Sequence, residues 1–369
     1  MIYFDASATT FQKPPAVRRA VLHAMECCAS PGRGGYSRAA MADELLFRTR
    51  QAAAALFDCQ PEQVVFTMNA THGLNVAIKS LAGSGDRVVI SGFEHNAVLR
   101  PLHALGAELV IAGRQLFDRE AVLSAFERAV TPDTAAVVCT HVSNVFGFIL
   151  PIEEIAALCA ARHVPLIVDA SQSAGTIPLS LSELGAAFIA MPGHKGLYGP
   201  PGTGLLLCAQ PGQPLLEGGT GTASMERTMP EELPERLEAG TANVWGIAGL
   251  LAGLHFVQDS GEEEILAHEQ SLRCRLTNRL EGMDAVQLYT GAAQTGVLSL
   301  RLRDVDSEDA ARMLGCRGIA VRAGLHCAPL AHESAGTLPG GTLRVSFSAF
   351  NSPREVDCFA RELGRIIRL

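Results

Sequence analysis

The sequence has few aromatic residues, few charges and no strongly basic segment. Of its 369 residues, 5% are aromatic and 18% are charged, and 30 Lys and Arg against 38 Asp and Glu leave a formal net charge of −8. An acidic chain without a basic block lacks the electrostatic footprint of a general nucleic-acid-binding protein. The hydrophobic fraction of 48% is too high for an intrinsically disordered chain.

Membrane segments and disulfide patterns are also missing. No apolar run reaches the roughly 18 residues that cross a bilayer, and residues 1–5 have neither the basic nor the apolar region of a signal peptide. The ten cysteines form no CxxC pair, and the adjacent Cys27 and Cys28 are poorly spaced for a disulfide. We therefore expect a reduced, cytoplasmic protein with no membrane or nucleic-acid partner, in which most cysteines are packing residues.

Short apolar runs of strand length alternate with amphipathic stretches, such as 43–58, in the first part of the chain. The runs are 64–68, 87–91, 108–112, 136–140, 165–169, 187–190 and 204–208. Continuous apolar strands are typical of a parallel sheet that is covered on both faces. The sequence therefore predicts an α/β fold whose large domain has a mostly parallel seven-stranded sheet flanked by helices.

The pattern changes after residue 208. Segment 209–238 is rich in proline and has almost no apolar period, which predicts either a functional loop or a disordered insertion. A helix with apolar residues between 247 and 257, a charged helix at 262–280 and a final helix from Pro353 are expected, with strands near 297–302 and 342–348. These elements predict a smaller α+β C-terminal domain. We place the large domain at 16–250 and the small domain at 251–369 together with 1–15.

Ligands of open α/β sheets bind outside the carboxyl ends of the strands. After strand 64–68, Ala70 and Thr71 lie in a small-residue turn that enters a helix, where free backbone N–H groups suit a phosphate. An N-cap is the ordinary interpretation of Thr71. Strand 165–169 ends at Asp169, which either caps the next turn or pairs with a cationic ring nitrogen of a ligand.

Lys195 lies in a Gly-rich turn after strand 187–190. A solvated turn lysine is the ordinary interpretation, but lysine also forms Schiff bases with aldehydes. A helix N-terminus for a phosphate, an Asp for a ring nitrogen and a Lys for an aldehyde together complete a site for pyridoxal 5′-phosphate (PLP). The combination therefore predicts a PLP enzyme.

Seven motifs occur in a characteristic order along the chain. They are Ala70-Thr71, Glu94-His95-Asn96, Ser143-Asn144, Asp169 to Gln172, Gly193-His194-Lys195, Ala239-Gly240-Thr241 and Arg344. This order resembles the class V aminotransferase superfamily of fold-type I PLP enzymes. Within that superfamily, segment 322–329 (RAGLHCAP) is similar to the cysteine desulfurase and selenocysteine lyase branch. The resemblance covers nearly the whole chain and implies the PLP-transferase fold type I.

The resemblance implies a set of cofactor-binding residues. Lys195 would hold the PLP aldehyde as a Schiff base, and Asp169 would pair with the pyridinium nitrogen. His95 would stack on the ring, although a satisfied histidine at a helix start is also compatible with its position. The remaining contacts would be Gln172 and Asn144 at the ring oxygen, Ala70, Thr71 and His194 at the phosphate, and Thr241 from the partner subunit of a homodimer.

The resemblance also implies how a small amino-acid substrate is held and attacked. Arg344 would grip the substrate carboxylate with its guanidinium fork, and Asn144 would lie nearby. Arg322 is either a surface ion pair or a second substrate contact. Lys195 would act as the base that removes the Cα proton, and Cys327 would be the nucleophile.

Cys327 could also be a packed thiol, but Gly324 and Pro329 around it favour a loop. A free thiol is mostly protonated at neutral pH, so Cys327 needs help, and His326 is its neighbour in sequence. A metal site on His326, Cys327 and His332 lacks further ligands, so we expect no metal.

Three positions depart from the family pattern. Pro192 stands where a hydroxyl residue commonly helps to bind the phosphate or the lysine, Leu325 replaces a histidine before His-Cys, and Tyr36 replaces a histidine near the entrance. The remaining histidines His72, His141 and His255 are expected to be structural.

The resemblance implies a PLP-dependent cysteine desulfurase that converts L-cysteine to L-alanine and leaves a persulfide on Cys327. L-Selenocysteine is a further candidate substrate, and a sulfur-acceptor protein is a candidate partner. Two other hypotheses stay open. One is an aminotransferase or epimerase in which Cys327 is incidental, and the other is a sulfur or selenium carrier with little turnover. Lys195 with Asp169 counts against the carrier, because a carrier needs neither.

Overall fold

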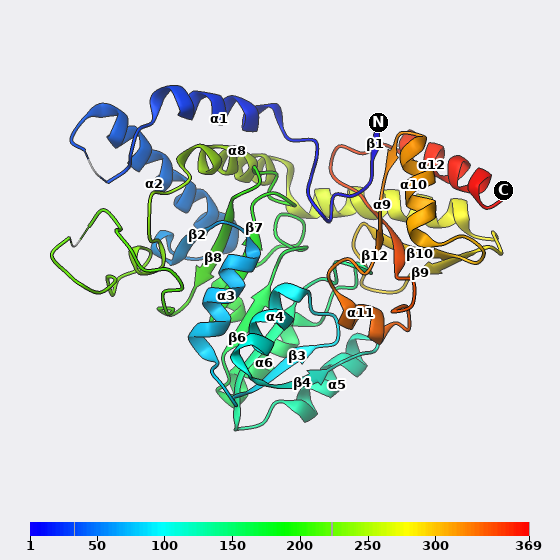
Figure 1. Ribbon diagram of the computed structural model, residues 1–369, viewed down its shortest axis with the longest axis horizontal. Helices are drawn as coiled ribbons and strands as arrows, with labels where there is room; N and C mark the ends of the chain where they lie inside the picture. Colours follow the sequence, from blue (N-terminus) through cyan, green and yellow to red (C-terminus); the bar gives the residue numbers. More distant parts are fainter. Residues whose placement is uncertain (33, 223, 369) are drawn as a thin grey trace.

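A computed structural model describes residues 1–32, 34–222 and 224–368 of the protein (Figure 1). Its larger sheet has seven strands in the order β2-β8-β7-β6-β5-β3-β4. The strands are β2 (Val64–Thr67), β3 (Arg87–Ser91), β4 (Glu108–Ala112), β5 (Thr134–Thr140), β6 (Leu166–Asp169), β7 (Phe188–Pro192) and β8 (Gly204–Cys208). Strands β3 to β7 are parallel, whereas β8 is antiparallel to both of its neighbours. The predicted mostly parallel sheet is confirmed.

Helices cover both faces of this sheet, which explains why its strands are continuous apolar runs. On β5, Val138 packs in the same cluster as residues of α3 (Ala70–Leu81) and α4 (Asn96–Leu105). Its neighbour Val137 packs on the other face. That face is covered by α2 (Ser37–Phe57), α5 (Arg119–Ala129), α6 (Ile152–Arg162) and α8 (Val244–Ser260). Helix α2 begins earlier than the predicted residue 43, at Ser37.

A second sheet of four antiparallel strands follows in the C-terminal part, in the order β12-β13-β10-β9. The strands are β9 (Val286–Tyr289), β10 (Val297–Leu302), β12 (Arg322–Gly324) and β13 (Thr342–Ser346). The apolar side of this sheet packs with α9 (Glu262–Leu280), α10 (Ser307–Cys316) and α12 (Pro353–Ile366). The expected α+β pattern of this part is confirmed.

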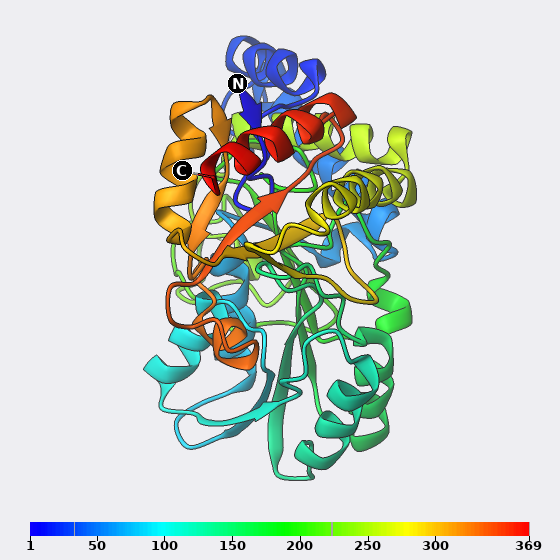
Figure 2. The same cartoon turned by 90° about the vertical axis from the view of Figure 1, so that its right-hand side faces the viewer.

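The N-terminal segment lies beside the C-terminal part of the chain, as Figure 2 shows. Strand β1 (Ile2–Tyr3) pairs in parallel with β11 (Ile319–Ala320), and Asp5 forms an isolated parallel bridge with Ser346 of β13. This pairing agrees with grouping residues 1–15 with the smaller unit, although the domain boundaries themselves stay a prediction.

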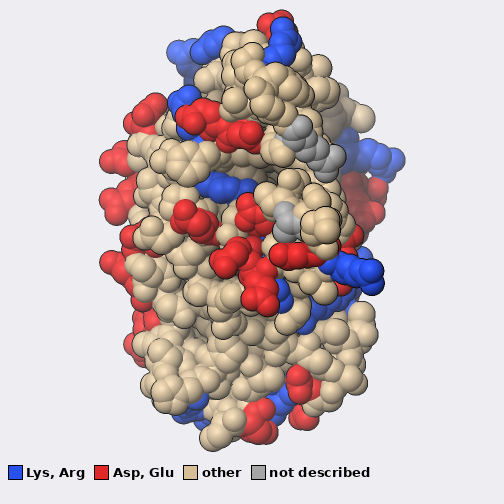
Figure 3. All heavy atoms as spheres, turned by 90° about the vertical axis from the view of Figure 1, so that its left-hand side faces the viewer, with Lys and Arg blue, Asp and Glu red and all other residues tan. Residues whose placement is uncertain are grey.

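The helices α1 (Pro15–Cys27), α2 and α8 pack together on the left of Figure 1, next to segment 209–238. Among its described residues, that segment has one short 3-10 turn, η2 (Glu235–Leu237), and no other helix or strand. Its end is anchored by Glu238, whose carboxylate accepts hydrogen bonds from Arg50 (2.7 Å) and from the backbone N–H of Phe66 (2.6 Å). Figure 3 views the molecule from this side.

Three shorter elements complete the description: η1 (Pro61–Gln63), α7 (Leu181–Leu184) and α11 (Pro329–Ser334). Within the described ranges, no helix combines the length and the apolar character needed to cross a membrane.

Candidate active site

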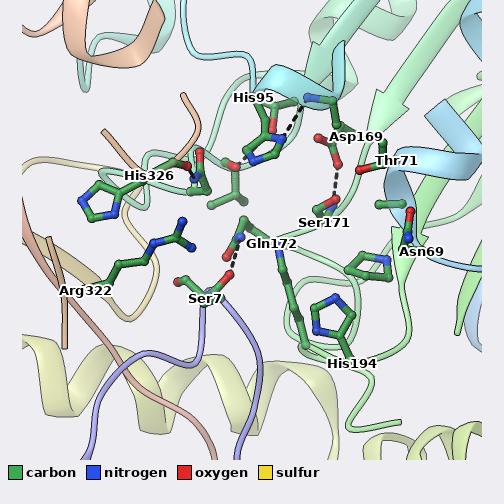
Figure 4. A pocket seen from close by; sticks show the side chains of 18 of the residues that line it. Ser7, Asn69, Thr71, His95, Asp169, Ser171, Gln172, His194, Arg322 and His326 are labelled. Carbon is green, nitrogen blue, oxygen red and sulfur yellow. Dashed lines mark hydrogen bonds between the residues drawn. The ribbon is translucent and has the colours of Figure 1, made fainter. Parts of the chain in front are cut away.

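A cavity of about 310 Å³ lies at the carboxyl ends of β5, β6 and β7 and is bordered by the N-terminal segment and the smaller sheet. Ten of the predicted site residues line it: Ala70, Thr71, His95, Asn144, Asp169, Gln172, His194, Lys195, Arg322 and Arg344. Figure 4 shows Arg322 and His326 on the opposite side of the cavity from Asp169 and Thr71. The motifs that are far apart in the sequence therefore meet at one place.

The N-terminus of α3 forms one wall of the cavity. The prediction that Thr71 is the N-cap is wrong, because the helix begins one residue earlier and Asn69 takes that role. The Asn69 side chain accepts the backbone N–H of His72 at 2.9 Å. Thr71, the second helical residue, is exposed and lines the cavity with Ala70. The backbone N–H groups of this first turn are therefore placed for an anion.

His95 is both the N-cap of α4 and a wall of the cavity, so the two interpretations of its position are compatible. Its Nδ1 accepts the backbone N–H of Ala97 at 3.0 Å, which leaves the ring proton on Nε2. Burial lowers the pKa of His95 to about 4, although the Asp169 carboxylate opposes this shift. The imidazole is thus neutral near pH 7.

Asp169 caps the turn that follows β6 and also lines the cavity, so the two interpretations of its sequence position are compatible. It is 3% exposed at the end of β6, and its Oδ1 accepts the backbone N–H of Ser171 at 2.9 Å. The same side chain lines the cavity. Gln172, one turn further along, donates its side-chain amide to the carbonyl oxygen of Ser7 at 3.0 Å and thereby connects the N-terminal segment to the cavity wall.

Lys195 lies in the turn after β7, half-buried and facing the same cavity. Burial lowers the pKa of its ammonium to about 8, while Asp169 favours the charged form. The turn is held by the carbonyl oxygen of His194, which accepts from Thr10 Oγ1 at 3.1 Å and Lys13 Nζ at 2.9 Å. His194 Nδ1 is buried and has no partner among the described residues, so the site offers an unused polar atom to a ligand.

Arg344 on β13 is 1% exposed and already engaged on two sides. Its Nη2 donates to Asp5 Oδ1 at 2.7 Å, and its Nη1 donates to the carbonyl oxygen of Asn144 at 2.8 Å. Its Nε is buried and has no partner in the described part of the chain. Arg322 on β12 is the register partner of Arg344, so both guanidinium groups come from the same face of the sheet.

Cys327 lies in the turn between β12 and α11, as the flanking Gly324 and Pro329 predicted. The residue is exposed and does not line the cavity itself, but its Sγ lies 3.8 Å from Nη2 of Arg322, which does. Two hydrogen bonds hold the turn against the larger domain. Asn144 Nδ2 donates to the carbonyl oxygen of His326 at 2.8 Å. The backbone N–H of Asn96 donates to the carbonyl oxygen of Cys327, also at 2.8 Å.

His326 is not the partner of the Cys327 thiol that its sequence position suggested. Its Nε2 lies 3.1 Å from the carbonyl oxygen of Thr342 and 3.2 Å from Thr342 Oγ1. Burial lowers the pKa of His326 to about 2, so the ring is neutral and supports the turn. The positive charge beside the Cys327 sulfur comes from Arg322.

Of four other expected positions, Pro192 lies at the cavity, and Thr241, Leu325 and Tyr36 lie outside it. Thr241 lines a separate hollow of about 230 Å³ with Met68 and His72, so within one chain it does not meet Lys195. Pro192 lines the cavity, whereas Leu325 is 40% exposed and Tyr36, 52% exposed, is the residue before α2.

Sequence reasoning missed several residues of the site. Ser7, Asn69 and Ser171 line the cavity, and Asp5 pairs with Arg344 across 339 positions of the chain. The available signals were the cluster of small polar residues at 5–10 and the N-cap chemistry of Asn69. Nothing in the sequence indicates the ion pair between Asp5 and Arg344, because this contact depends on the β1–β11 and Asp5–Ser346 pairings.

The fold and the cavity define an α/β enzyme class in which a lysine and an aspartate at neighbouring strand ends face one binding site. A family model described as "Aminotransferase class-V" matches residues 2–359. The chain therefore belongs to the class V aminotransferase family, whose members depend in general on PLP.

Its relatives within that family are more specific. The chain is 32% identical to a "Probable cysteine desulfurase" of Methanothermobacter thermautotrophicus, over 99% of this chain and 94% of the relative. It is 33% identical to a "Cysteine desulfurase" of Klebsiella pneumoniae, with 100% and 94% covered. The solved cysteine desulfurase of Thermococcus onnurineus NA1 is similar with a TM-score of 0.91 and 30% identity, over 100% of this chain and 94% of that one.

Proposed function

We propose that this protein is a PLP-dependent cysteine desulfurase that converts L-cysteine to L-alanine and retains the sulfur as a persulfide on Cys327. One observation carries the proposal: Lys195, Asp169 and His95 converge on one cavity whose far side holds Arg344 and Arg322, with Cys327 next to Arg322. The names of the relatives support the same substrate and reaction.

The residues of the cavity fit PLP in their chemistry. The first turn of α3, with Ala70 and Thr71, and the unpartnered buried Nδ1 of His194 suit a phosphate. Asp169 supplies an anion for a protonated ring nitrogen, and the neutral ring of His95 suits stacking. When bound through Lys195, PLP supplies an electron sink for the electron pair left by the Cα proton. Gln172 and Asn144 complete the proposed set of contacts.

Lys195 is proposed to be the base that takes the Cα proton. Its pKa of about 8 makes a neutral amine accessible near physiological pH, as a general base requires. Arg344 and Arg322 together are proposed to hold the substrate α-carboxylate, because both line the cavity and a guanidinium matches a carboxylate. The second hypothesis for Arg322, a surface ion pair, is disfavoured because no acidic partner lies within 4.0 Å among the described residues.

Cys327 is proposed to attack the sulfur atom of the substrate as a thiolate. The new S–S bond forms while the Cβ–S bond of the substrate breaks, the electron pair stays with the carbon fragment, and a proton completes alanine. The Arg322 guanidinium lies 3.8 Å from Sγ and so places a positive charge beside the attacking sulfur. Because Cys327 is exposed, an acceptor protein can reach the persulfide.

We also propose that the protein is a homodimer in which Thr241 reaches the PLP phosphate of the partner subunit. Thr241 lies outside its own cavity, which is compatible with a contribution to another one. Large exposed apolar side chains occur on α1, α2 and α8 and in segment 209–238: Leu22, Met25, Met41, Phe47, Leu216, Met225 and Trp245. Such exposed residues on neighbouring elements favour a protein interface, and Figure 3 shows this side of the molecule.

The experiment compares wild-type holoenzyme, Cys327→Ala and Cys316→Ala, in which another exposed cysteine is removed. With L-cysteine and a thiol reductant, wild type and Cys316→Ala should release equal amounts of alanine and sulfide. Cys327→Ala should lose both while the cofactor absorbance is retained. L-Selenocysteine in a parallel assay reports the preferred chalcogen. Unchanged cysteine turnover in Cys327→Ala would show that Cys327 is not the nucleophile. Pyruvate-dependent amino transfer without sulfide release would favour the aminotransferase.

A further inference from the structure

Two arginines face each other across the β12–β13 strand pair at the edge of the cavity. Arg322 and Arg344 are directly opposite in the antiparallel register, and both line the cavity. Directly opposed like charges destabilise a sheet unless anions compensate them. Burial lowers the pKa of Arg344, the Asp5 carboxylate opposes this shift, and the Arg322 charge adds to it.

The protein itself supplies one of the two compensating charges. Asp5 Oδ1 lies 2.7 Å from Nη2 of Arg344, and the two side chains are 19% and 1% exposed. No carboxylate of the described residues lies within 4.0 Å of Arg322, whose Nη2 lies 3.8 Å from the Cys327 sulfur. The arginine pair therefore carries two positive charges, one resident anion and room for a second anion.

Asp5 does not line the cavity. It therefore affects ligand binding only indirectly, through its contact with Arg344 and through its negative charge. Two anchors orient the Arg344 guanidinium: Asp5 on Nη2 and the carbonyl oxygen of Asn144 on Nη1. These two bonds use two of the five N–H groups of the guanidinium, and Nε has no partner among the described residues. An arriving α-carboxylate thus meets a guanidinium that is fixed in orientation but already half neutralised.

We propose that Asp5 is a positioning residue that moderates the affinity of the Arg322–Arg344 pair for an α-carboxylate. The proposal rests on the proposed function in so far as substrate and product are both α-amino acids. L-Cysteine and L-alanine carry the same α-carboxylate. A lower affinity of the arginine pair for that carboxylate, caused by Asp5, therefore allows the product to leave. Without the Asp5 charge, both ligands would be held more tightly.

The test uses the holoenzyme and the variant Asp5→Asn, which keeps an oxygen acceptor for Arg344 and removes the charge. The dissociation constants of L-alanine and L-alaninamide are measured by calorimetry and by the absorbance of the bound cofactor. We expect the constant for L-alanine to fall about tenfold, as the loss of one nearby partly screened charge predicts. The dissociation constant for L-alaninamide, which has no carboxylate, should not change. KM for L-cysteine should fall in parallel with the dissociation constant for L-alanine.

Asp357→Asn is the matched control, because it breaks another 2.7 Å ion pair, with Arg275, that lies outside the cavity. It should leave both dissociation constants unchanged. A constant for L-alanine that is unchanged or higher in Asp5→Asn overturns the proposal, and so does equal tightening of L-alaninamide. A merely structural role for Asp5 would weaken binding rather than tighten it.

If Asp5→Asn does not fold, Asp5→Ser, which also removes the charge but keeps a hydroxyl oxygen, tests the same proposal. L-Alanine should again bind about tenfold more tightly than to wild type, and the affinity for L-alaninamide should be unchanged. An L-alanine constant that is unchanged or higher in Asp5→Ser overturns the proposal. These titrations need no desulfuration, so a wild-type protein that binds L-alanine without cleaving L-cysteine refutes the proposed function alone.

Discussion

Asn144 connects the turn that carries Cys327 to the larger sheet: its side-chain amide donates to the carbonyl oxygen of His326, one residue before Cys327, at 2.8 Å. The connection matters because His326 and Cys327 both have positive φ values, of 50° and 58°. Two successive non-glycine residues in the left-handed region are unfavourable and need support from their surroundings. Asn144 and the backbone N–H of Asn96 provide it.

We expect Asn144→Ala to reduce persulfide formation on Cys327 by about 100-fold, because displacing a reacting group by about 1 Å has an effect of that size. Mass spectrometry of the cysteine peptide after one turnover measures this. Cofactor content is determined on the same samples, since Asn144 is also proposed to contact PLP. The exposed Asn278→Ala is the control. Full persulfide formation in Asn144→Ala would show that the turn keeps its conformation without this hydrogen bond.

The two roles of His95 can be separated by one substitution. Asn is a strong N-cap residue, so His95→Asn retains the cap of α4 and removes the ring. We expect unchanged thermal stability of the apoprotein and a dissociation constant for PLP that rises about fivefold, as the loss of roughly 1 kcal/mol of stacking predicts. His95→Ala, measured beside it, should also lose about 1 kcal/mol of stability with the cap. Equal PLP affinity in wild type and His95→Asn would exclude the stacking role.

Much of the larger sheet could be predicted from the sequence. The seven apolar runs end within two residues of the observed strands. For all of them except the partly exposed edge strand β4, the reason is that burial on both faces leaves an uninterrupted apolar signature. Asp169 and Lys195 could be brought together for a related reason. Parallel strands end at the same edge, so residues that follow β6 and β7 must be neighbours.

Contacts that depend on tertiary packing could not be predicted in the same way. Sequence adjacency suggested His326 as the helper of Cys327, but the turn directs the His326 ring toward Thr342 and leaves Arg322 beside the sulfur. The cap of α3 illustrates a smaller uncertainty. Asn69 and Thr71 both have capping side chains, and the helix start decides between them.

Glu94 makes the stability of the protein dependent on pH. It is fully buried, Oε1 accepts from Ser91 Oγ and from the backbone N–H of Thr140, and burial raises its pKa to about 8. The folded state keeps this proton up to about pH 8, whereas the unfolded chain releases it near the ordinary value of 4.5. The resulting contribution to stability is complete below about pH 4.5 and is lost as the pH rises to 8.

Glu94→Gln retains the acceptor oxygen and never ionises. Its stability relative to wild type should therefore increase between pH 5 and pH 8, by roughly 2–4 kcal/mol. Urea unfolding of the two apoproteins at both pH values measures the difference. The exposed Glu108→Gln should show no comparable trend. A stability difference between Glu94→Gln and wild type that does not vary with pH would mean that Glu94 is ionised in the folded protein.

Glu238 should be the principal anchor of segment 209–238. It forms a bidentate ion pair with Arg50 at 2.9 and 2.7 Å. The Arg50 and Glu238 side chains are 12% and 18% exposed. The Arg50 guanidinium also lies 4.3 Å from the centre of the Phe66 ring. Removing one partner of a largely buried pair leaves an uncompensated charge. We therefore expect Glu238→Ala to lower the free energy of unfolding by about 3 kcal/mol.

The control for this prediction is Arg312→Ala, which breaks an exposed ion pair with Asp309 inside α10 and should cost less than about 1 kcal/mol. Urea unfolding measures both variants, and limited proteolysis of segment 209–238 reports local release. A loss in Glu238→Ala no larger than in Arg312→Ala would show that solvent reaches Arg50 and compensates its charge. Because Thr241 lies three residues beyond Glu238, a released anchor should also weaken PLP binding in the proposed dimer, whereas Arg312→Ala should not.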